Sequence, residues 1–152
     1  MLASLYMLAM SLTHGHAYAR CVGAATTIVN VVSRTDAAFA YPRLAAEDPD
    51  AARERLGRLL TVWAYHESSY TPSAVGDHGR SVGLLQLSPS LAGRSAAELR
   101  NPHTNVEAAI DVLRRLVAQC GSLPRALGAY ASGHCGGAPA LVARRCAEAG
   151  GC

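Results

Sequence analysis

Two carboxylates, Glu67 and Asp77, stand ten residues apart in the stretch HESSYTPSAVGDHGRSVGLLQL, which spans residues 66–87. Glu67 follows Trp63 by four residues and Leu60 by seven, so a helix would place its carboxyl on one stripe with these apolar side chains. Burial against an indole and the negative end of a helix dipole both raise a carboxyl pKa. A carboxyl kept protonated near neutral pH at the mouth of a cleft suits a general acid.

Glu67 has a second interpretation, as a solvated glutamate at a helix end that pairs with His66 or with an arginine. The loop that follows favours the first interpretation, because its three glycines and few bulky residues let the backbone approach a ligand closely. Gln86 lies inside the apolar run LLQL, where its amide must find a partner. A ligand's hydroxyl or acetamido group would serve, and so would a backbone carbonyl.

The composition favours a helical scaffold for these residues. The chain has 152 residues, enough for one domain with a single core. Half of the residues are apolar, with alanine prominent among them, and only eight are aromatic (six Tyr, one Trp and one Phe). Alanine has the highest helix propensity and fills strands poorly, so this composition argues against a sandwich or a barrel. We therefore expect a mainly α fold.

One long helix is expected to carry Glu67. Asp48-Pro49 supplies an N-cap and a proline at the first helical position, and the helix should run to about Tyr70, since Pro72 cannot continue it. A loop is expected over residues 71–83. Residues 22–41 are expected to form a helix or a strand that ends at Pro42. Capping-box patterns stand at Ser95–Glu98 and Thr104–Glu107, and the second opens a periodic helix. Two further helices are expected, one over 123–130 after Ser122 and one from near Pro139 to the Gly150-Gly151 pair.

The N-terminal segment is predicted to be a signal peptide over residues 1–19. An apolar run is followed by a polar stretch and by Ala17-Tyr18-Ala19, a small-x-small cleavage pattern, directly before Arg20. The run lacks a preceding Lys or Arg, and its alternative interpretation is an amphipathic helix that packs on the domain. The segment is too short for a membrane span. Residues 20–47 are then an N-terminal extension of a domain over 48–152.

The five cysteines fit an exported protein better than a metal protein. Four of them could form two disulfides and leave one over, although the sequence does not decide the pairing. Their spacings match no two-pair zinc motif, so we expect no metal and no cofactor. His134-Cys135 could also be a base beside a thiol nucleophile, but adjacent residues rarely face each other. The net charge of +3, carried mostly by scattered arginines, gives no nucleic-acid signal.

Three motifs together carry a resemblance to a known family. Residues 67–68 (ES) and 83–87 (GLLQL) resemble the ES…GLMQ core of the soluble lytic transglycosylases, which belong to the lysozyme-like superfamily. Residues 101–106 (NPHTNV) are similar to the family's Asn-Ile segment, and residues 127–133 (LGAYASG) resemble its A-Y-N-A-G motif. The resemblance covers residues 52–134. It implies a lysozyme-like single domain with a helical core and a substrate cleft.

The resemblance also implies a substrate and roles for individual residues. The substrate would be peptidoglycan, cleaved at the β-1,4 bond between N-acetylmuramic acid (MurNAc) and N-acetylglucosamine (GlcNAc), with Glu67 as general acid. Gln86 and Tyr130 would line the sugar cleft, and Ser68 and Gly83 would hold the helix and loop in place. In that family one glutamate acts first as acid and then as base, closing the C6 hydroxyl on C1 to give a 1,6-anhydro product without water. A second carboxylate is not needed.

Departures from the family pattern keep alternatives open. Ala131 stands where the family has asparagine, and Asp77 where it often has a small polar residue. Goose-type lysozymes carry an aspartate there that places a water, and carboxyls roughly 6.5–9.5 Å apart permit an inverting hydrolysis. Asp77 could equally be a turn residue before His78. Goose-type enzymes tend to have a further aspartate where Ser88 stands here, which favours the lyase.

The biological setting is less constrained than the chemistry. A wall-binding module that has lost catalysis would keep the same groove. A space-making enzyme attached to a secretion or conjugation apparatus, or carried in a phage particle, would share the chemistry and differ only in its partner. We expect a periplasmic or secreted monomer that binds peptidoglycan glycan strands.

Overall fold

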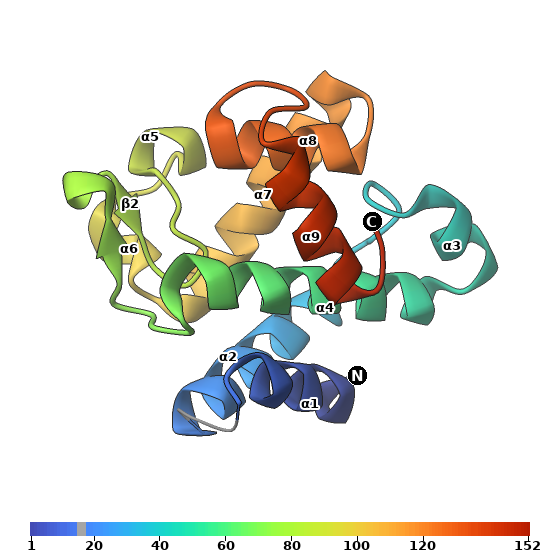
Figure 1. Cartoon of the computed structure of the whole chain (residues 1–152), viewed down its shortest axis with the longest axis horizontal. Coiled ribbons are helices and arrows are strands. Elements are labelled where there is room, and N and C mark those ends of the chain that lie inside the picture. The colour runs from blue at the N-terminus through green and yellow to red at the C-terminus, as the bar shows by residue number, and fades with distance from the viewer. Residues whose placement is uncertain (15–17) are drawn as a thin grey trace.

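The central helix α4 (Pro49–Ser68) organises the molecule (Figure 1). The computed structural model describes residues 1–14 and 18–152. Asp48 caps α4, since its Oδ1 accepts from the backbone N–H groups of Asp50 and Ala51, both at 3.0 Å. The helix ends at Ser69, whose left-handed φ of 49° turns the chain away. The start of this helix and its end near Tyr70 agree with the prediction.

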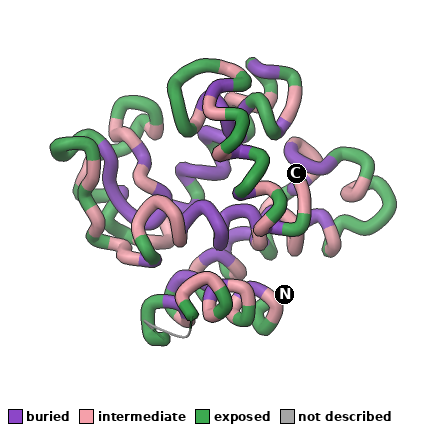
Figure 2. Tube along the Cα trace, viewed as in Figure 1, coloured by how far each residue is buried: buried purple, intermediate pink, exposed green. Residues whose placement is uncertain are grey.

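Helices pack on two sides of α4, and the prediction of a mainly α fold is confirmed. α1 (Leu2–Leu12) and α2 (Tyr18–Val32) lie on one side, and α8 (Leu123–Ser132) and α9 (Pro139–Ala149) lie on the other (Figure 1). α7 (Pro102–Cys120) packs against α2 and α8. The buried stretches of the chain follow the middle of α4 and α7 (Figure 2), and the apolar stripe of α4 is entirely inside: Leu56, Leu59, Leu60, Trp63 and Ala64.

A small lobe of short elements follows α4. It holds β1 (Val75–Gly76), the 3₁₀ turn η1 (Asp77–Gly79), β2 (Ser81–Val82), α5 (Pro89–Ala92) and α6 (Ala96–Leu99). β1 and β2 pair antiparallel, with Val75 opposite Val82 and Gly76 opposite Ser81. The predicted loop over 71–83 therefore contains a two-residue hairpin. Strands this short leave no period-2 pattern in the sequence, so the hairpin was not predictable from alternation.

Asn105, on α7, fixes the small lobe to the helical core. Its buried side chain donates to the carbonyls of Val82 and Leu99, both at 3.0 Å, and accepts from the N–H of Leu85 at 2.9 Å. Gly83 makes this approach possible, because any side chain there would collide with the Asn105 amide. One amide thus satisfies three backbone groups in a segment that has little regular structure of its own.

Two expectations about helix starts had different outcomes. The capping box of Ser95 and Glu98 is confirmed, with the side chain of each bonded to the backbone N–H of the other. The predicted cap at Thr104 is wrong, because α7 starts at Pro102 with Asn101 as its N-cap. Asparagine is a stronger cap than threonine and proline is pre-organised for the first helical position, so this pair prevails.

The N-terminal region is helical and contributes to the core. The ambiguous stretch 22–41 begins inside α2, and Pro42 starts α3 (Pro42–Glu47) as well as ending the preceding segment. On α1, Leu5 and Ala9 are fully buried, and Leu5 faces Gly57 of α4. The signal-peptide prediction stays a prediction, and the Ala17 of its cleavage pattern lies outside the described residues. None of the described helices combines the length and apolar character needed to cross a membrane.

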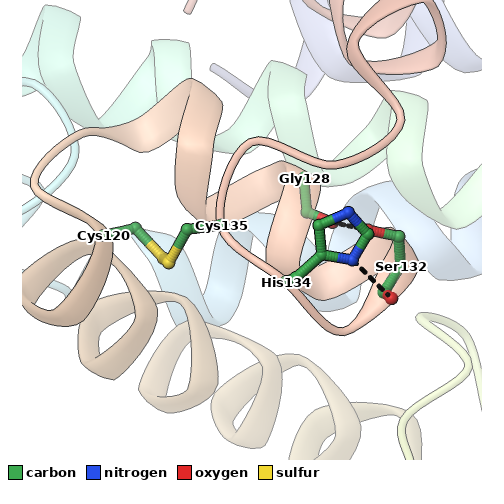
Figure 3. Close-up of a disulfide and its surroundings, with 5 residues drawn as sticks. All are labelled: Cys120, Gly128, Ser132, His134 and Cys135. Atoms are coloured by element: carbon green, nitrogen blue, oxygen red, sulfur yellow. Dashed lines mark hydrogen bonds between the residues drawn. A yellow bond between two sulfur atoms is a disulfide. The ribbon is translucent and has the colours of Figure 1, made fainter.

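Four of the five cysteines form two disulfides, Cys120–Cys135 and Cys146–Cys152. The first joins the end of α7 to the segment that follows α8 (Figure 3). The second closes the end of α9 onto the residues after it. Cys21 is buried in the core. Two disulfides fit an oxidising compartment.

Replacing Asn105 by alanine tests its role in holding the lobe. Asn105→Ala leaves the Leu85 N–H and the Leu99 carbonyl buried without partners, so we expect a loss of about 2–4 kcal/mol in the free energy of unfolding. Urea denaturation measures the loss. The exposed Asn30→Ala serves as control and should stay within about 0.5 kcal/mol of the wild type. Equal stability of the two variants would contradict the role of Asn105.

Candidate active site

A cavity of about 470 Å³ opens where the end of α4, the β1–β2 hairpin, α8 and α9 come together. Four residues that the sequence analysis singled out, Glu67, Asp77, Gln86 and Tyr130, all line it. These residues come from separate parts of the chain, so the fold brings them together. The other lining residues are Gly76, Ser81, Ala131, Leu141 and Arg145.

A second hollow of about 450 Å³ lies between α1 and α2 but offers little chemistry. Its lining is apolar apart from Thr26 and two tyrosines, with no carboxylate, histidine or arginine among the lining residues. A third hollow, of about 270 Å³, is lined by charged side chains that include Asp36, Glu107 and Asp111, but by none of the candidate site residues from the sequence analysis. No group of three or more His, Cys, Asp or Glu side chains within the described part of the chain could hold a metal ion.

Glu67 lies in the last turn of α4 and forms an ion pair. Its Oε1 accepts from Nη1 of Arg145 at 2.6 Å, and the exposed fractions of the two side chains are 24% and 8%. The Arg145 guanidinium lies 4.5 Å from the ring centroid of Trp63. His66 turns instead to Glu148, with 2.6 Å between Nε2 and Oε2. Of the partners expected for Glu67, the structure shows an arginine and not the histidine.

Arg145 was missed as a site residue, although the sequence holds a signal for it. Val142, Arg145 and Ala149 are the buried residues of α9, at spacings of three and four residues. An arginine on the apolar stripe of an amphipathic helix must find a partner inside the protein. The sequence does not say which partner, because Glu67 is 78 residues away.

Tyr130 forms part of the cavity wall and is anchored from behind. Its hydroxyl donates to the carbonyl of Leu85 at 2.6 Å, and its ring meets Trp63 edge to face at 6.4 Å between centroids. Burial raises the pKa of Tyr130 well above its ordinary value of 10.0, and the negative charge of Glu67 raises it further, while Arg145 acts in the opposite direction. The phenol therefore stays protonated and keeps its hydrogen bond at physiological pH.

Gln86 turns its amide nitrogen inward. Nε2 donates to the carbonyls of Gly83 at 2.8 Å and Ala74 at 3.2 Å, so a backbone partner satisfies the amide, as one of the expected alternatives had it. The residue has a left-handed φ of 46°, which directs the side chain back across the loop. Gly76 has no side chain, and any there would collide with Oε1 of Gln86.

Asp77 combines a turn position with a place in the cavity. It begins η1 with a left-handed φ of 49°, in keeping with a turn residue. Its Oδ2 accepts from the hydroxyl of Ser81 at 2.8 Å, which holds the carboxylate in one orientation. Because Asp77 and Glu67 line the same cavity, the turn interpretation and the catalytic interpretation are compatible in this fold.

Ser68 and Gly83 are not among the residues that line the cavity. The Ser68 hydroxyl donates to the carbonyl of Ala64 at 3.0 Å and accepts from the N–H of Thr71 at 3.2 Å, which bridges the end of α4 to the next segment. Gly83 has a φ of 88° and lies directly against Asn105. Both residues are placed to support the walls from behind.

His134 and Cys135 do not form a nucleophile and its base. Cys135 is joined to Cys120, and His134 points to Ser132, whose hydroxyl is 3.3 Å from Nδ1 (Figure 3). Ser132 Oγ in turn donates to the carbonyl of Gly128 at 2.8 Å, within α8. A sulfur held in a disulfide is not available as a thiolate.

A carboxyl group in the last turn of a long central helix, beside a cavity in a mainly α domain, fits a lysozyme-like helical fold. A family model described as "Transglycosylase SLT domain" matches residues 47–138, and the chain belongs to this family. It is thus a protein of lytic transglycosylase type that acts on peptidoglycan. Searches of curated proteins and of solved structures each gave no match. The matched segment includes Glu67 and Tyr130, whereas α9 lies beyond it.

Tyr130→Phe should lower stability and change how stability depends on pH. At neutral pH the Leu85 carbonyl loses its donor, at a cost of about 1–2 kcal/mol. Above pH 10.0 the unfolded chain releases the phenolic proton while the fold retains it, so Tyr130 makes wild-type stability fall as pH rises toward its folded pKa. The variant should therefore lose stability less steeply between about pH 10 and 11.5.

Urea denaturation over this pH range measures both effects. On the full-length chain, which retains residue 18, the exposed Tyr18→Phe is the matched control and should follow the wild type within about 0.5 kcal/mol. Parallel stability curves for the wild type and Tyr130→Phe above pH 10 would disprove the burial of an un-ionised phenol.

Proposed function

We propose that the chain is a peptidoglycan lytic transglycosylase that cleaves the MurNAc-β-1,4-GlcNAc bond and leaves 1,6-anhydroMurNAc ends. One observation carries the proposal: Glu67 and Gln86, from the ES…GLLQL core, and Tyr130, from the LGAYASG motif, line a single cavity within the matched family segment and its neighbours. A carboxyl that is about one-quarter exposed at the cavity wall can reach a bound glycan.

Glu67 supplies both proton transfers in this reaction. As an acid it gives its proton to the glycosidic oxygen while the bond to C1 breaks, which releases GlcNAc with a free hydroxyl. The resulting carboxylate then takes the proton of the C6 hydroxyl as O6 attacks C1 of the same MurNAc. The proton count balances without water, and the glutamate returns to its starting form.

Gln86 and Tyr130 are proposed to position the sugar. Both donor positions of the Gln86 amide serve backbone carbonyls, so its oxygen remains to accept a hydrogen bond from a sugar hydroxyl or an acetamido N–H. The Tyr130 proton is taken by Leu85, so this residue offers its ring and the lone pairs of its oxygen. Ala131 and Leu141 add apolar surface to the same cavity.

A second candidate function is hydrolysis by a muramidase. The observation in its favour is that Asp77 lines the cavity with its carboxylate held by Ser81. In this reaction Asp77 would activate a water that attacks C1 as Glu67 protonates the leaving oxygen, and the product would carry a reducing end. A wall-binding module without catalysis would bind the glycan and release nothing.

Mass spectrometry of muropeptides released from purified peptidoglycan distinguishes these functions. Wild-type protein should release anhydro ends, lighter by one water than reducing ends. Glu67→Gln should lower release by about 10²–10⁴-fold, because it removes the proton that is transferred. Asp77→Asn should cost little in a lyase and most of the rate in a hydrolase.

The matched controls are Glu107→Gln and Asp111→Asn, two exposed carboxylates on α7 that should leave the rate unchanged. Reducing ends would replace the transglycosylase by the muramidase. An active Glu67→Gln protein with a native circular dichroism spectrum would refute Glu67 as the catalyst. Absence of products from folded wild-type protein would favour the binding module.

We also propose that the protein works in the periplasm or outside the cell, where its substrate lies. Its two disulfides support an oxidising compartment. The predicted cleavage after Ala19 is tested by the intact mass of protein recovered outside the cytoplasm. A mass that begins at Arg20 is expected, whereas a full-length mass would show that α1 is retained with its buried Leu5 and Ala9.

A further inference from the structure

Arg145 reaches the cavity from α9, a helix beyond the segment that the family model matches. α9 crosses α4 (Figure 1) and is fastened there at its C-terminal end. Two arginines of α4 donate to its terminal carbonyls: Nε of Arg58 to Ala149 at 2.9 Å, and Nη1 of Arg55 to Gly150 at 2.8 Å. These two hydrogen bonds attach the C-terminal end of α9 to α4 and involve no side chain that lines the cavity.

Further contacts restrict α9 on the C-terminal side of Arg145. His66 and Glu148 pair at 2.6 Å, one residue along α4 from Glu67. The Cys146–Cys152 disulfide begins at the residue that follows Arg145. These contacts hold the C-terminal end of α9 against α4, and the Arg145 side chain lines the cavity.

Burial of the Arg145 side chain carries a desolvation cost in free energy that packing alone does not offset. Only 8% of it is exposed, and its Nε has no hydrogen-bond partner among the described residues. Desolvating a guanidinium is expensive, and an apolar side chain in this place would avoid the penalty. Its favourable contacts are the face of the Trp63 ring at 4.5 Å and Oε1 of Glu67 at 2.6 Å.

We propose that Arg145 is a positioning residue for the catalytic carboxyl, an inference that rests on the proposed function. Arg145 holds Oε1 of Glu67, so that Oε2 is the oxygen that carries the proton and exchanges it with the glycan. When the proton leaves for the glycosidic oxygen, the guanidinium is already in place beside the carboxylate that forms. A cation fixed in advance stabilises this charge without reorganisation during the reaction.

Trp63 makes the geometry specific for arginine. The planar guanidinium stacks on the indole and presents its N–H groups in a rigid fork, whereas a lysine ammonium is a flexible point charge. Lysine would therefore restore the charge beside Glu67 without fixing the orientation of the carboxyl. Glutamine would restore neither.

The test compares kcat and KM for release of fragments from purified glycan strands by Arg145→Gln, Arg145→Lys and the control Arg144→Gln. Arg144 is a neighbouring arginine of α9 whose side chain is 63% exposed, outside the cavity. Arg145→Gln should lose about 10²-fold in kcat, the cost expected for a misplaced catalytic group, with KM little changed. Arg145→Lys should recover part of the loss, and Arg144→Gln should match the wild type.

Chemical rescue separates positioning from support of the fold. Guanidinium chloride at low millimolar concentration should restore part of the kcat of Arg145→Gln, since the small cation can occupy the vacated place. It should not restore Glu67→Gln. Thermal unfolding of each variant is measured alongside, and where Arg145→Gln does not fold, Arg145→Lys carries the test through its kcat.

Several outcomes would overturn the inference. A wild-type kcat in Arg145→Gln, or in Arg145→Lys where that variant carries the test, means that Arg145 does not position the acid. A raised KM with unchanged kcat assigns Arg145 to substrate binding instead. A lowered kcat without guanidinium rescue, in step with a lowered melting temperature, makes the residue structural. Failure of wild-type protein to cleave glycan would instead refute the proposed function.

Discussion

The cavity depends on one buried amide, that of Asn105. The segment between α4 and α7 consists of very short elements joined by turns, and groups such as the Leu85 N–H and the Leu99 carbonyl find their partner outside the segment. Buried N–H and C=O groups without partners are costly, so such a segment needs an external source of hydrogen bonds. Asn105 provides three, and thereby attaches the wall that contains Asp77 and Gln86 to a long, well-packed helix.

Much of the fold follows from local sequence, and the exceptions have identifiable causes. The cap at Asp48, the box at Ser95 and the ends of α9 depend on neighbouring residues, so the sequence predicts them correctly. The cap at Thr104 fails because Asn101-Pro102 offers a stronger start three residues earlier. Of the ambiguous stretch over residues 22–41, residues 22–32 lie in α2, because packing against α4 and α7 decides between two weak propensities.

Some features of the site also follow from local sequence, whereas others depend on residues far apart in the chain. Helical spacing places Glu67 on the stripe of Trp63 without reference to the rest of the chain, and the structure agrees. Its ion pair with Arg145 joins residues 78 positions apart, and no local rule selects that arginine from the others. Asp77 illustrates a different limit, because turn chemistry explains its type fully while its position in the cavity depends on how the hairpin folds over α4.

The two disulfides act on the same side of the cavity. Cys120–Cys135 encloses α8, which carries Tyr130, and Cys146–Cys152 closes the end of α9 beside Arg145. Closing a loop of 15 residues lowers the conformational entropy of the unfolded chain, which stabilises the fold by about 3 kcal/mol. Residues 48–119, which provide Glu67 and the opposite wall, contain no cysteine. The wall formed by α8 and α9 is therefore tied to the oxidation of its cysteines, whereas the wall that carries Glu67 and Asp77 contains no disulfide.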